Sequence, residues 1–141
     1  MTILDTNVLS ELMKPNPSPN VVSWTESQLS SELFIASITQ SEILYGIALL
    51  PDGKRKDSLQ LAAKLMFEED FDRRILPFDQ LAAEFYATIA ASHKNSGKPI
   101  SQFDAQIAAI AKSRGAKLST RNEKDFSNCG IKIINPWTYS W

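Results

Sequence analysis

Short apolar segments alternate with longer amphipathic ones along the whole chain. Each apolar segment has the length of a buried strand, and each amphipathic segment repeats its apolar side chains at helical spacing. The predicted strands are Thr2–Leu4, Leu33–Ala36, Arg74–Phe78, Ala116–Thr120 and Ile131–Ile134. The predicted helices are Thr6–Met13, Asn20–Leu29, Thr39–Leu50, Ser58–Phe67, Gln80–Ser96 and Ser101–Arg114. This alternation predicts an α/β fold, with helices on both faces of a mainly parallel sheet of four to five strands.

Four acidic residues lie at the junctions of these segments. Asp5 directly follows the first predicted strand, and Glu42 lies near the start of the helix after the second. Asp104 lies near the start of the helix before the fourth strand, and Asp125 follows that strand by a few residues. In a doubly wound sheet, helix N-termini gather at the carboxyl edge of the strands, where such folds bind ligands. We therefore expect the four carboxylates to converge on one edge of the sheet.

Each acid also has a local explanation. Thr39-Gln40-Ser41-Glu42 and Ser101-Gln102-Phe103-Asp104 both match a helix capping box, in which the acid bonds back to the cap residue. Asp5 at a helix N-terminus would be stabilised by the helix dipole, and Asp125 would cap a short helix after it. Several carboxylates in one dry cleft, however, repel one another unless a cation neutralises them. An oxygen-only set without His or Cys suits Mg²⁺, with Mn²⁺ as an alternative, better than Zn²⁺.

Length and composition predict one globular domain over residues 1–141, since 43% of the chain is hydrophobic and 22% is charged. The formal net charge of -1 does not indicate nucleic acid, although a local basic rim would be sufficient to hold phosphates. The single cysteine, Cys129, excludes an intrachain disulfide and favours a reducing cytoplasm. We interpret its thiol as buried or incidental. No segment has the length expected of a signal peptide or a membrane span.

Four short motifs, in this order and at these separations, resemble the PIN-domain ribonucleases, and most closely the bacterial toxins of VapBC type and their FitB-like relatives. The motifs are Leu4-Asp5-Thr6-Asn7-Val8, Ser41-Glu42-Ile43-Leu44-Tyr45-Gly46-Ile47, Asp104-Ala105-Gln106-Ile107-Ala108-Ala109, and Thr120-Arg121-Asn122 with Asp125-Phe126. The resemblance extends over nearly the whole chain. It implies a three-layer α/β/α domain, metal-dependent endoribonuclease activity and a homodimer. It also implies a small antitoxin partner whose own segment binds operator DNA.

By position, Asp5, Glu42 and Asp104 match the three most regular acids of that family. We assign Asp5 and Asp104 as direct ligands of the metal, and Glu42 as a residue that binds the metal through water or orients the attacking water. The fourth position stays open between Asn122, whose amide oxygen brings no charge, and Asp125.

The inferred reaction is hydrolysis of an RNA phosphodiester, in which carboxylate-bound Mg²⁺ lowers the pKa of its water and polarises the phosphoryl oxygen. Thr6, Thr120 and Asn122 would orient metal-bound water or the carboxylates, and helix capping is an equally good role for Thr6. Arg121 would hold a substrate phosphate, with a solvated charge as the alternative. The only histidine, His93, has no part in this reaction, and we expect it at the surface.

Other α/β folds explain the acids less well. A signalling receiver domain needs an acidic pair at the end of its first strand, and a phosphoaspartate hydrolase needs a second acid where this chain has Asn7. A non-catalytic PIN-like module that binds RNA or a protein partner stays open as an alternative, because Asn122 carries no charge. The intact set of Asp5, Glu42 and Asp104 favours the enzyme.

Overall fold

A sheet of five short parallel strands runs through the centre of the computed structural model, which describes residues 1–140. The strands are β1 (Thr2–Leu4), β2 (Leu33–Ala36), β3 (Ile75–Leu76), β4 (Lys117–Ser119) and β5 (Ile133–Ile134). Their order in the sheet is β3-β2-β1-β4-β5. The chain thus builds outwards from β1 to one side and then to the other. The junction of β1 and β4 is the switch point, where parallel sheets of this kind open a crevice for ligands.

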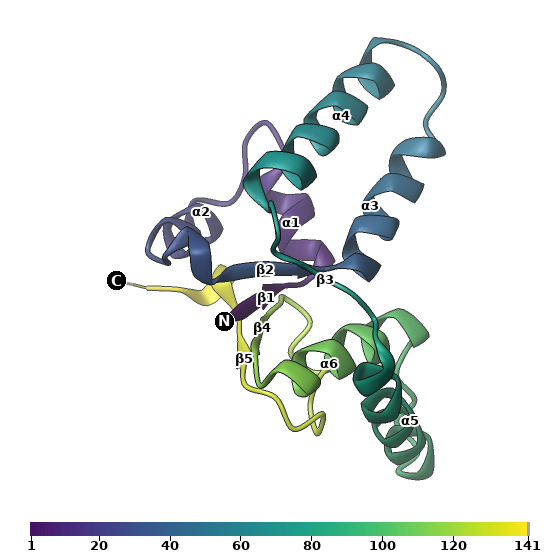
Figure 1. Ribbon diagram of the computed structural model, residues 1–141. Coiled ribbons are helices and arrows are strands. Elements are labelled where there is room, and N and C mark those ends of the chain that lie inside the picture. Colours follow the sequence, from purple (N-terminus) through teal and green to yellow (C-terminus); the bar gives the residue numbers. More distant parts are fainter. Residues whose placement is uncertain (141) are drawn as a thin grey trace.

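Within the described residues, six α-helices cover the two faces of the sheet (Figure 1). On one face lie α1 (Thr6–Leu12), α2 (Pro19–Glu26), α3 (Ser37–Ala48) and α4 (Lys54–Leu65). On the other face lie α5 (Gln80–Asn95) and α6 (Gln102–Arg114). Short helical turns occur at Ser30–Glu32, Met66–Asp70 and Pro136–Thr138. The predicted α/β/α arrangement is confirmed. None of the helices in residues 1–140 combines the length and apolar character that a membrane span requires.

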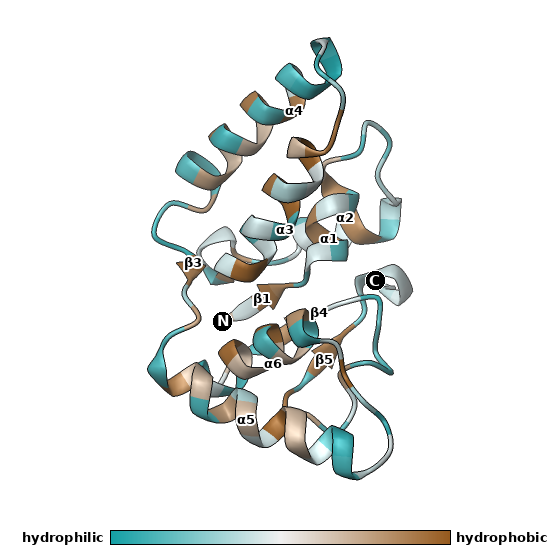
Figure 2. Cartoon of the chain, turned by 90° about the vertical axis from the view of Figure 1, so that its right-hand side faces the viewer, coloured by the Kyte–Doolittle hydropathy of each residue, from teal (hydrophilic) through white to brown (hydrophobic). Residues whose placement is uncertain are grey.

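The sheet separates two hydrophobic clusters. Ile3 packs with the cluster that contains α6, whereas its neighbour Leu4 packs with α1 and α2, because successive strand residues point to opposite faces. Ile107 and Ile110 fill the first cluster, and Trp24 is buried in the second. Figure 2 shows the apolar strands, in brown, between the two helical layers. Both faces of the sheet are therefore dry, and polar side chains reach water mainly at its edges.

Helix caps agree with the sequence in three places. Asp79 accepts a hydrogen bond from the N–H of Ala82 at the start of α5, and Ser101 caps α6. Gly115 ends α6 with φ of 61°, a left-handed conformation that glycine adopts without strain. The capping box at Thr39 was wrong, because α3 begins two residues earlier, at Ser37, and Thr39 lies buried inside the helix.

Two further expectations were wrong. The apolar pattern around Phe103 predicts a core position for its ring, but Phe103 is 52% exposed, because it lies in the first turn of α6, before the buried residues of that helix begin at Ala105. The fourth helix begins at Lys54 rather than Ser58, so that Lys54, Arg55 and Lys56 form its first turn.

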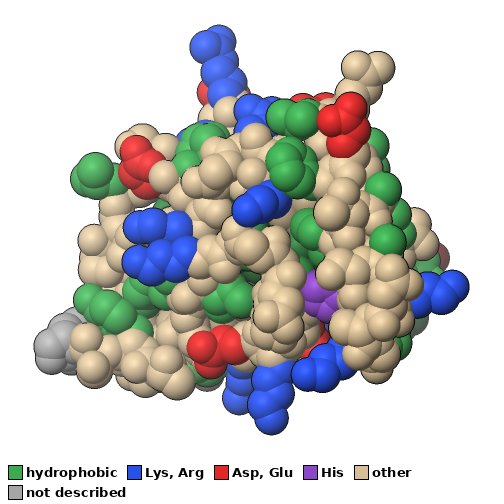
Figure 3. Space-filling model, turned by 90° about the horizontal axis from the view of Figure 1, so that it is seen from below, with side chains coloured by type: hydrophobic (Ala, Val, Ile, Leu, Met, Phe, Trp, Pro, Cys, Tyr) green, Lys and Arg blue, Asp and Glu red, His purple; other side chains and the backbone are tan. Residues whose placement is uncertain are grey.

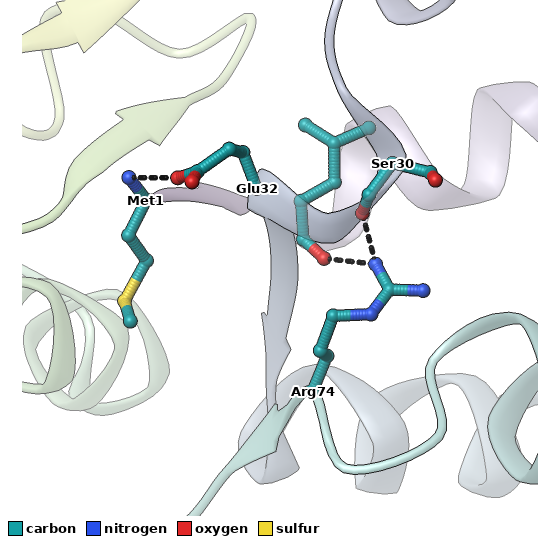
Figure 4. Close-up of polar contacts among 5 residues, drawn as sticks. Met1, Ser30, Glu32 and Arg74 are labelled. Atoms are coloured by element: carbon teal, nitrogen blue, oxygen red, sulfur yellow. Dashed lines mark hydrogen bonds and ion pairs between the residues drawn. The ribbon is translucent and has the colours of Figure 1, made fainter.

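Polar contacts close the amino edge of the sheet, on the side away from Asp5. The amino group of Met1 pairs with Glu32 at 2.7 Å (Figure 4). The guanidinium of Arg74 donates hydrogen bonds to the carbonyl oxygens of Ser30, Leu33 and Asp70. Arg74 thereby ties the segment before β2 to the segment before β3.

Candidate active site

Asp5 lies at the carboxyl end of β1, at the switch point of the sheet. Its backbone N–H donates to the carbonyl of Ser119, which joins β1 to β4. Its side chain is only 3% exposed and accepts hydrogen bonds from the Thr6 N–H at 2.8 Å, Thr120 Oγ1 at 2.7 Å and Asn7 Nδ2 at 3.2 Å. Because a hydroxyl, an amide and a backbone N–H all point at this carboxylate, its position is closely defined.

Glu42 reaches the same edge from α3. Thr6 Oγ1 donates to Glu42 Oε1 at 2.8 Å and lies 2.9 Å from Thr39 Oγ1. Since an ionised carboxylate only accepts hydrogen bonds, the Thr6 proton points to Glu42, and Thr39 in turn donates to Thr6. A chain of two hydroxyls therefore orients the Glu42 carboxylate from the core. Thr39 is fully buried, and its role here was missed because its position matched a helix cap.

Asp104 enters from α6 on the opposite layer. It is half-buried in the first turn of that helix, where its N–H donates to Ser101 Oγ at 3.2 Å. Burial raises the pKa of its carboxyl, the hydrogen bond with Ser101 opposes this, and the charge of Asp125 adds to the rise. Asp104 is therefore both a helix-start residue and a carboxylate that faces another acid.

The electrostatics join the acids into one site. Burial is the largest cause that raises the pKa of Asp5 to about 6, against the hydrogen bonds from Thr120 and Thr6, which lower it. The charges of Asp104 and Glu42 raise it further. The charges of Asp104 and Glu42 therefore act on the Asp5 carboxylate across the sheet edge, and the charge of Asp125 acts on Asp104. Mutual repulsion of this kind is relieved by a cation.

The donor set is chemically suited to a hard divalent cation, because it consists of carboxylate oxygens with hydroxyl and amide oxygens around them. Within residues 1–140, however, no three His, Cys, Asp or Glu side chains lie together in an arrangement ready to hold a metal ion. Both Asp5 oxygens accept hydrogen bonds from neighbouring groups instead. The residues fit the metal in type, and their side chains would have to turn towards it.

The loop after β4 supports Asp5 rather than adding a charge to it. Thr120 is fully buried, donates to Asp5 and accepts a hydrogen bond from the N–H of Asn122 at 3.0 Å. Asn122 thus acts on the site through its backbone. The N–H of Arg121 donates to Asn7 Oδ1 at 3.3 Å, so that Asn7 joins α1 to this loop.

The two charged side chains predicted in this loop lie in different surroundings. The guanidinium of Arg121 stacks over the ring of Trp137 at 5.0 Å. Asp125 is exposed, and its N–H donates to the carbonyl of Asn122 in a run of turns, so the short helix expected after it does not form. The charge of Asp125 acts on Asp104, which makes it the better placed of the two residues considered for the fourth position.

The expectation that His93 is a surface residue was wrong. Its side chain is buried, with Nδ1 3.0 Å from the carbonyl oxygen of Ile89 and Nε2 3.0 Å from that of Ser127. It therefore joins α5 to the loop that carries Asp125. The adjacent Lys94 suggested a solvated face, but the helix turns His93 inwards. Cys129 is buried beside it, and burial raises the pKa of this thiol to about 11, as expected of an incidental cysteine.

Two cavities flank the acids. One, of about 450 Å³, includes Asp104 and Asp125 in its wall. The other, of about 750 Å³, lies between α1, α3 and α4 and includes Thr6 and Glu42. Figure 3 shows the molecule from the side of α5 and α6, where basic side chains, in blue, lie near the histidine, in purple.

The chain is similar to known proteins over nearly its whole length. The family model for the PIN domain matches residues 2–132. The chain is 39% identical to the VapC ribonuclease Y4jK of Sinorhizobium fredii, over 97% of this chain and 98% of the relative. It is 38% identical to the toxin FitB of Neisseria gonorrhoeae, over 97% and 99% of the two chains. A chain in the structure of FitAB bound to an IR36 DNA fragment superimposes with a TM-score of 0.93, at 37% identity, over 100% of this chain and 99% of that chain.

Proposed function

The chain belongs to the PIN domain family, and from this premise we propose that it is the toxin of a VapBC-type toxin–antitoxin pair, an endoribonuclease that hydrolyses RNA phosphodiester bonds. Two relatives that it matches over nearly their whole length are named a VapC ribonuclease and a toxin. The observation that carries the proposal is the buried Asp5, whose pKa is raised to about 6 and which faces Asp104 and Glu42 at the switch point of the sheet.

We assign a divalent cation, Mg²⁺ or Mn²⁺, to this site, with Asp5 and Asp104 as direct ligands and Glu42 as a ligand through water. Such an ion supplies an acidified water molecule and polarises the phosphoryl oxygen. The chain's own residues prepare that chemistry. Thr120 and the Thr6 N–H hold the Asp5 carboxylate, and the Thr6 hydroxyl aims Glu42. Asp125, through its charge on Asp104, is our choice for the fourth position.

We also propose a small antitoxin partner that binds operator DNA through its own segment. The related FitAB structure supports this, since it is a complex bound to DNA. Further support comes from the groove of about 750 Å³, which includes the apolar residues Ile43, Ile47 and Leu59 together with Glu42. A peptide in that groove would lie against an acid of the site. The proposed RNA substrate and the free thiol of Cys129 favour a cytoplasmic location. Residues 1–141 are proposed to form one domain.

A homodimer is proposed from the apolar side chains that α3 and α4 present to solvent. The exposed fractions are 67% for Tyr45, 66% for Leu49 and 60% for Leu61. Exposed apolar groups of this size on one helical hairpin are typical of a protein interface. Sedimentation of the purified chain tests this directly, with Leu49→Glu as the variant expected to yield a monomer.

Cleavage of RNA tests the central proposal. Purified protein is incubated with RNA in Mg²⁺, in Mn²⁺ and in excess chelator, beside Asp5→Asn and the control Asp72→Asn. Asp72 is exposed, on the segment before β3 at the opposite edge of the sheet. Asp5→Asn is expected to lower the rate at least about 100-fold, more than the loss of a group that merely supports a ligand. Cleavage in chelator, or undiminished cleavage by Asp5→Asn, would contradict it. RNA binding without cleavage would instead support the non-catalytic module.

A further inference from the structure

The cavity of about 450 Å³ beside Asp104 is built from two segments that are distant in sequence, one that joins α5 to α6 and one that follows β4. Lys98 follows the end of α5, Ser101 begins α6, and Lys124, Asp125 and Asn128 belong to the loop after β4. Its volume lies within the range of roughly 300–1,000 Å³ that is typical of small-ligand sites. Because Asp104 is part of its wall, anything bound in the cavity lies next to the proposed reaction centre.

We propose that this cavity, called the lysine cavity below, binds the RNA nucleotide next to the cleaved bond, with Lys98 and Lys124 contacting the phosphate of that nucleotide. The inference rests on the proposed function and adds the residues that position its substrate. The lining residues include four serines, an asparagine and two lysines, whose polar groups suit ribose and phosphate better than an apolar ligand.

The two lysines are free to take a ligand. Three of the other lysines are engaged: Lys14 pairs with Glu11, Lys56 with Asp52, and Lys112 donates to the carbonyl of Gly130. In the part of the chain that the structure describes, the ammonium groups of Lys98 and Lys124 have neither an ion pair nor a hydrogen bond. Two unpaired ammonium groups at one cavity provide a local positive charge for a phosphate, although the net charge of the chain is slightly negative.

The backbone that carries Lys98 is firmly held. At the end of α5, the N–H of Gly97 bonds to the carbonyl of Lys94, and the N–H of Lys98 bonds to that of His93 at 3.0 Å. This pair of bonds is a Schellman motif, and it requires the left-handed conformation that Gly97 adopts at φ of 74°. Lys98 therefore leaves the helix in one defined direction.

The loop that carries Lys124 is held by a contact with His93 of α5. His93 Nε2 contacts the carbonyl of Ser127, and Ser127 Oγ donates to the carbonyl of Lys124 at 2.8 Å. The buried histidine thus supports the wall of the lysine cavity, which explains why a polar ring is buried at this position. Because both walls are formed in advance, binding requires the ordering of only the two flexible lysine side chains.

The charges around the lysine cavity also suit a phosphodiester. The acids Asp104 and Asp125, near which a cation is proposed, line the same cavity as Lys98 and Lys124. An RNA strand that passes from the acids into the cavity would place one phosphate at the cation and the next at the lysines. An acidic protein segment is the competing occupant, and the experiment below separates the two.

The test measures binding of a fluorescent single-stranded RNA to the full chain in the Asp5→Asn background, which prevents cleavage. The double variant Lys98→Gln/Lys124→Gln is compared with Lys64→Gln/Lys117→Gln, which removes the same charge from exposed positions on α4 and at the amino end of β4. The cavity variant is expected to weaken binding about tenfold more than the control, and to reduce the slope of log affinity against log salt by about 0.7, since one phosphate contact is lost. Lys98→Arg/Lys124→Arg should restore most of the affinity, since the charge is retained.

Kinetics on the cleaving protein provide the second measurement. The cavity variant should raise KM about tenfold and change kcat less than about threefold, since it removes binding and not chemistry. Equal RNA affinity in the cavity and control variants would overturn the inference, as would a loss confined to binding of a protein partner. If the unchanged chain cleaves no RNA, the proposed function fails, and the binding measurement still decides whether the lysine cavity holds RNA.

Discussion

The two edges of the sheet carry charge in opposite ways. At the amino edge, the Met1 ammonium and Glu32 neutralise each other at 2.7 Å, and a hydrogen bond and the charge of the N-terminus lower the pKa of Glu32. At the carboxyl edge, the pKa of Asp5 is raised to about 6 by burial and that of Asp104 is raised as well. Within residues 1–140, no lysine or arginine forms an ion pair with either acid.

The difference separates stability from function. Charges at the amino edge hold neighbouring segments together, as Arg74 does with three carbonyl groups. Carboxylates at the carboxyl edge repel one another and oppose folding until a cation binds. This electrostatic condition is expected of a site that binds a cation. Substitutions at the two edges should therefore change different measurable quantities.

Among variants that keep all the acids, the largest effect is expected on activity, from Thr120→Val. This change removes the hydroxyl that donates to Asp5 and accepts from the Asn122 N–H, while the shape of the side chain is kept. The RNA cleavage rate should fall about 10–100-fold, as is usual when a group that orients a metal ligand is lost. Thr120→Ser retains the hydroxyl and serves as the control. Equal rates for the Val and Ser variants would show that the hydroxyl does not orient Asp5.

Arg74→Ala tests the amino edge. The change leaves carbonyl oxygens of Ser30, Leu33 and Asp70 without their charged donor, and it removes the stacking of Arg74 on Phe71. The free energy of unfolding in urea should fall by about 2–4 kcal/mol. The cleavage rate of the molecules that remain folded should be unchanged. Arg55→Ala, at an exposed position on α4, is the matched control, and an equal loss there would contradict the role of Arg74.

Asp5→Asn should increase the free energy of unfolding, whereas most substitutions lower it. In chelator, Asp5→Asn should make the protein more stable at pH 8, by about 2–3 kcal/mol, since it removes a carboxylate whose pKa is about 6 in the fold and 3.8 outside it. Between these values the folded state binds more protons than the unfolded state, so stability falls as the pH rises through this range. The advantage of the variant should disappear below about pH 4.

Urea unfolding at several pH values measures this difference, with Asp72→Asn as the control that should show no such trend. If Asp5→Asn were less stable at pH 8 without metal, the hydrogen bonds to Asp5 would outweigh its burial. The contrast between the two edges of the sheet would then be lost.

The smallest effect is expected at Ser119, the last residue of β4. Its hydroxyl is the one buried side-chain polar atom among residues 1–140 without a hydrogen-bond partner. Ser119→Ala removes an unsatisfied group and should raise the free energy of unfolding by up to about 1 kcal/mol, without changing cleavage. Ser113→Ala, which removes a hydroxyl that donates to the carbonyl of Ile110, should not stabilise. A loss of activity in Ser119→Ala would mean that the hydroxyl serves the site.

Local sequence patterns were sufficient for much of the fold. The apolar runs at β1 and β2 and the cap at Ser101 depend on a few neighbouring residues, and they were predicted. Three strands, β3, β4 and β5, are shorter than predicted, because pairing with neighbouring strands decides where a strand ends. For the site, the motifs pointed to residues from four separate segments, and the structure brings their charges within range of one another.

Contacts between distant segments decided the rest. Thr39 matched a cap locally, yet a hydroxyl from α1, 33 residues away, bonds to it inside α3. His93 looked solvated, but a carbonyl 34 residues further on approaches its ring. Such hydrogen bonds leave no local pattern, because each partner alone satisfies an ordinary rule for its own helix.

The sequence by itself determined the alternation of strands and helices, and it identified the acids that belong to one chemistry. Only the tertiary structure decided how those acids are supported and where unpaired lysines line a cavity beside Asp104. The physical reason is that periodicity and capping act over a few residues. Burial and Coulomb interactions depend on distance in space, and the order of the strands sets that distance.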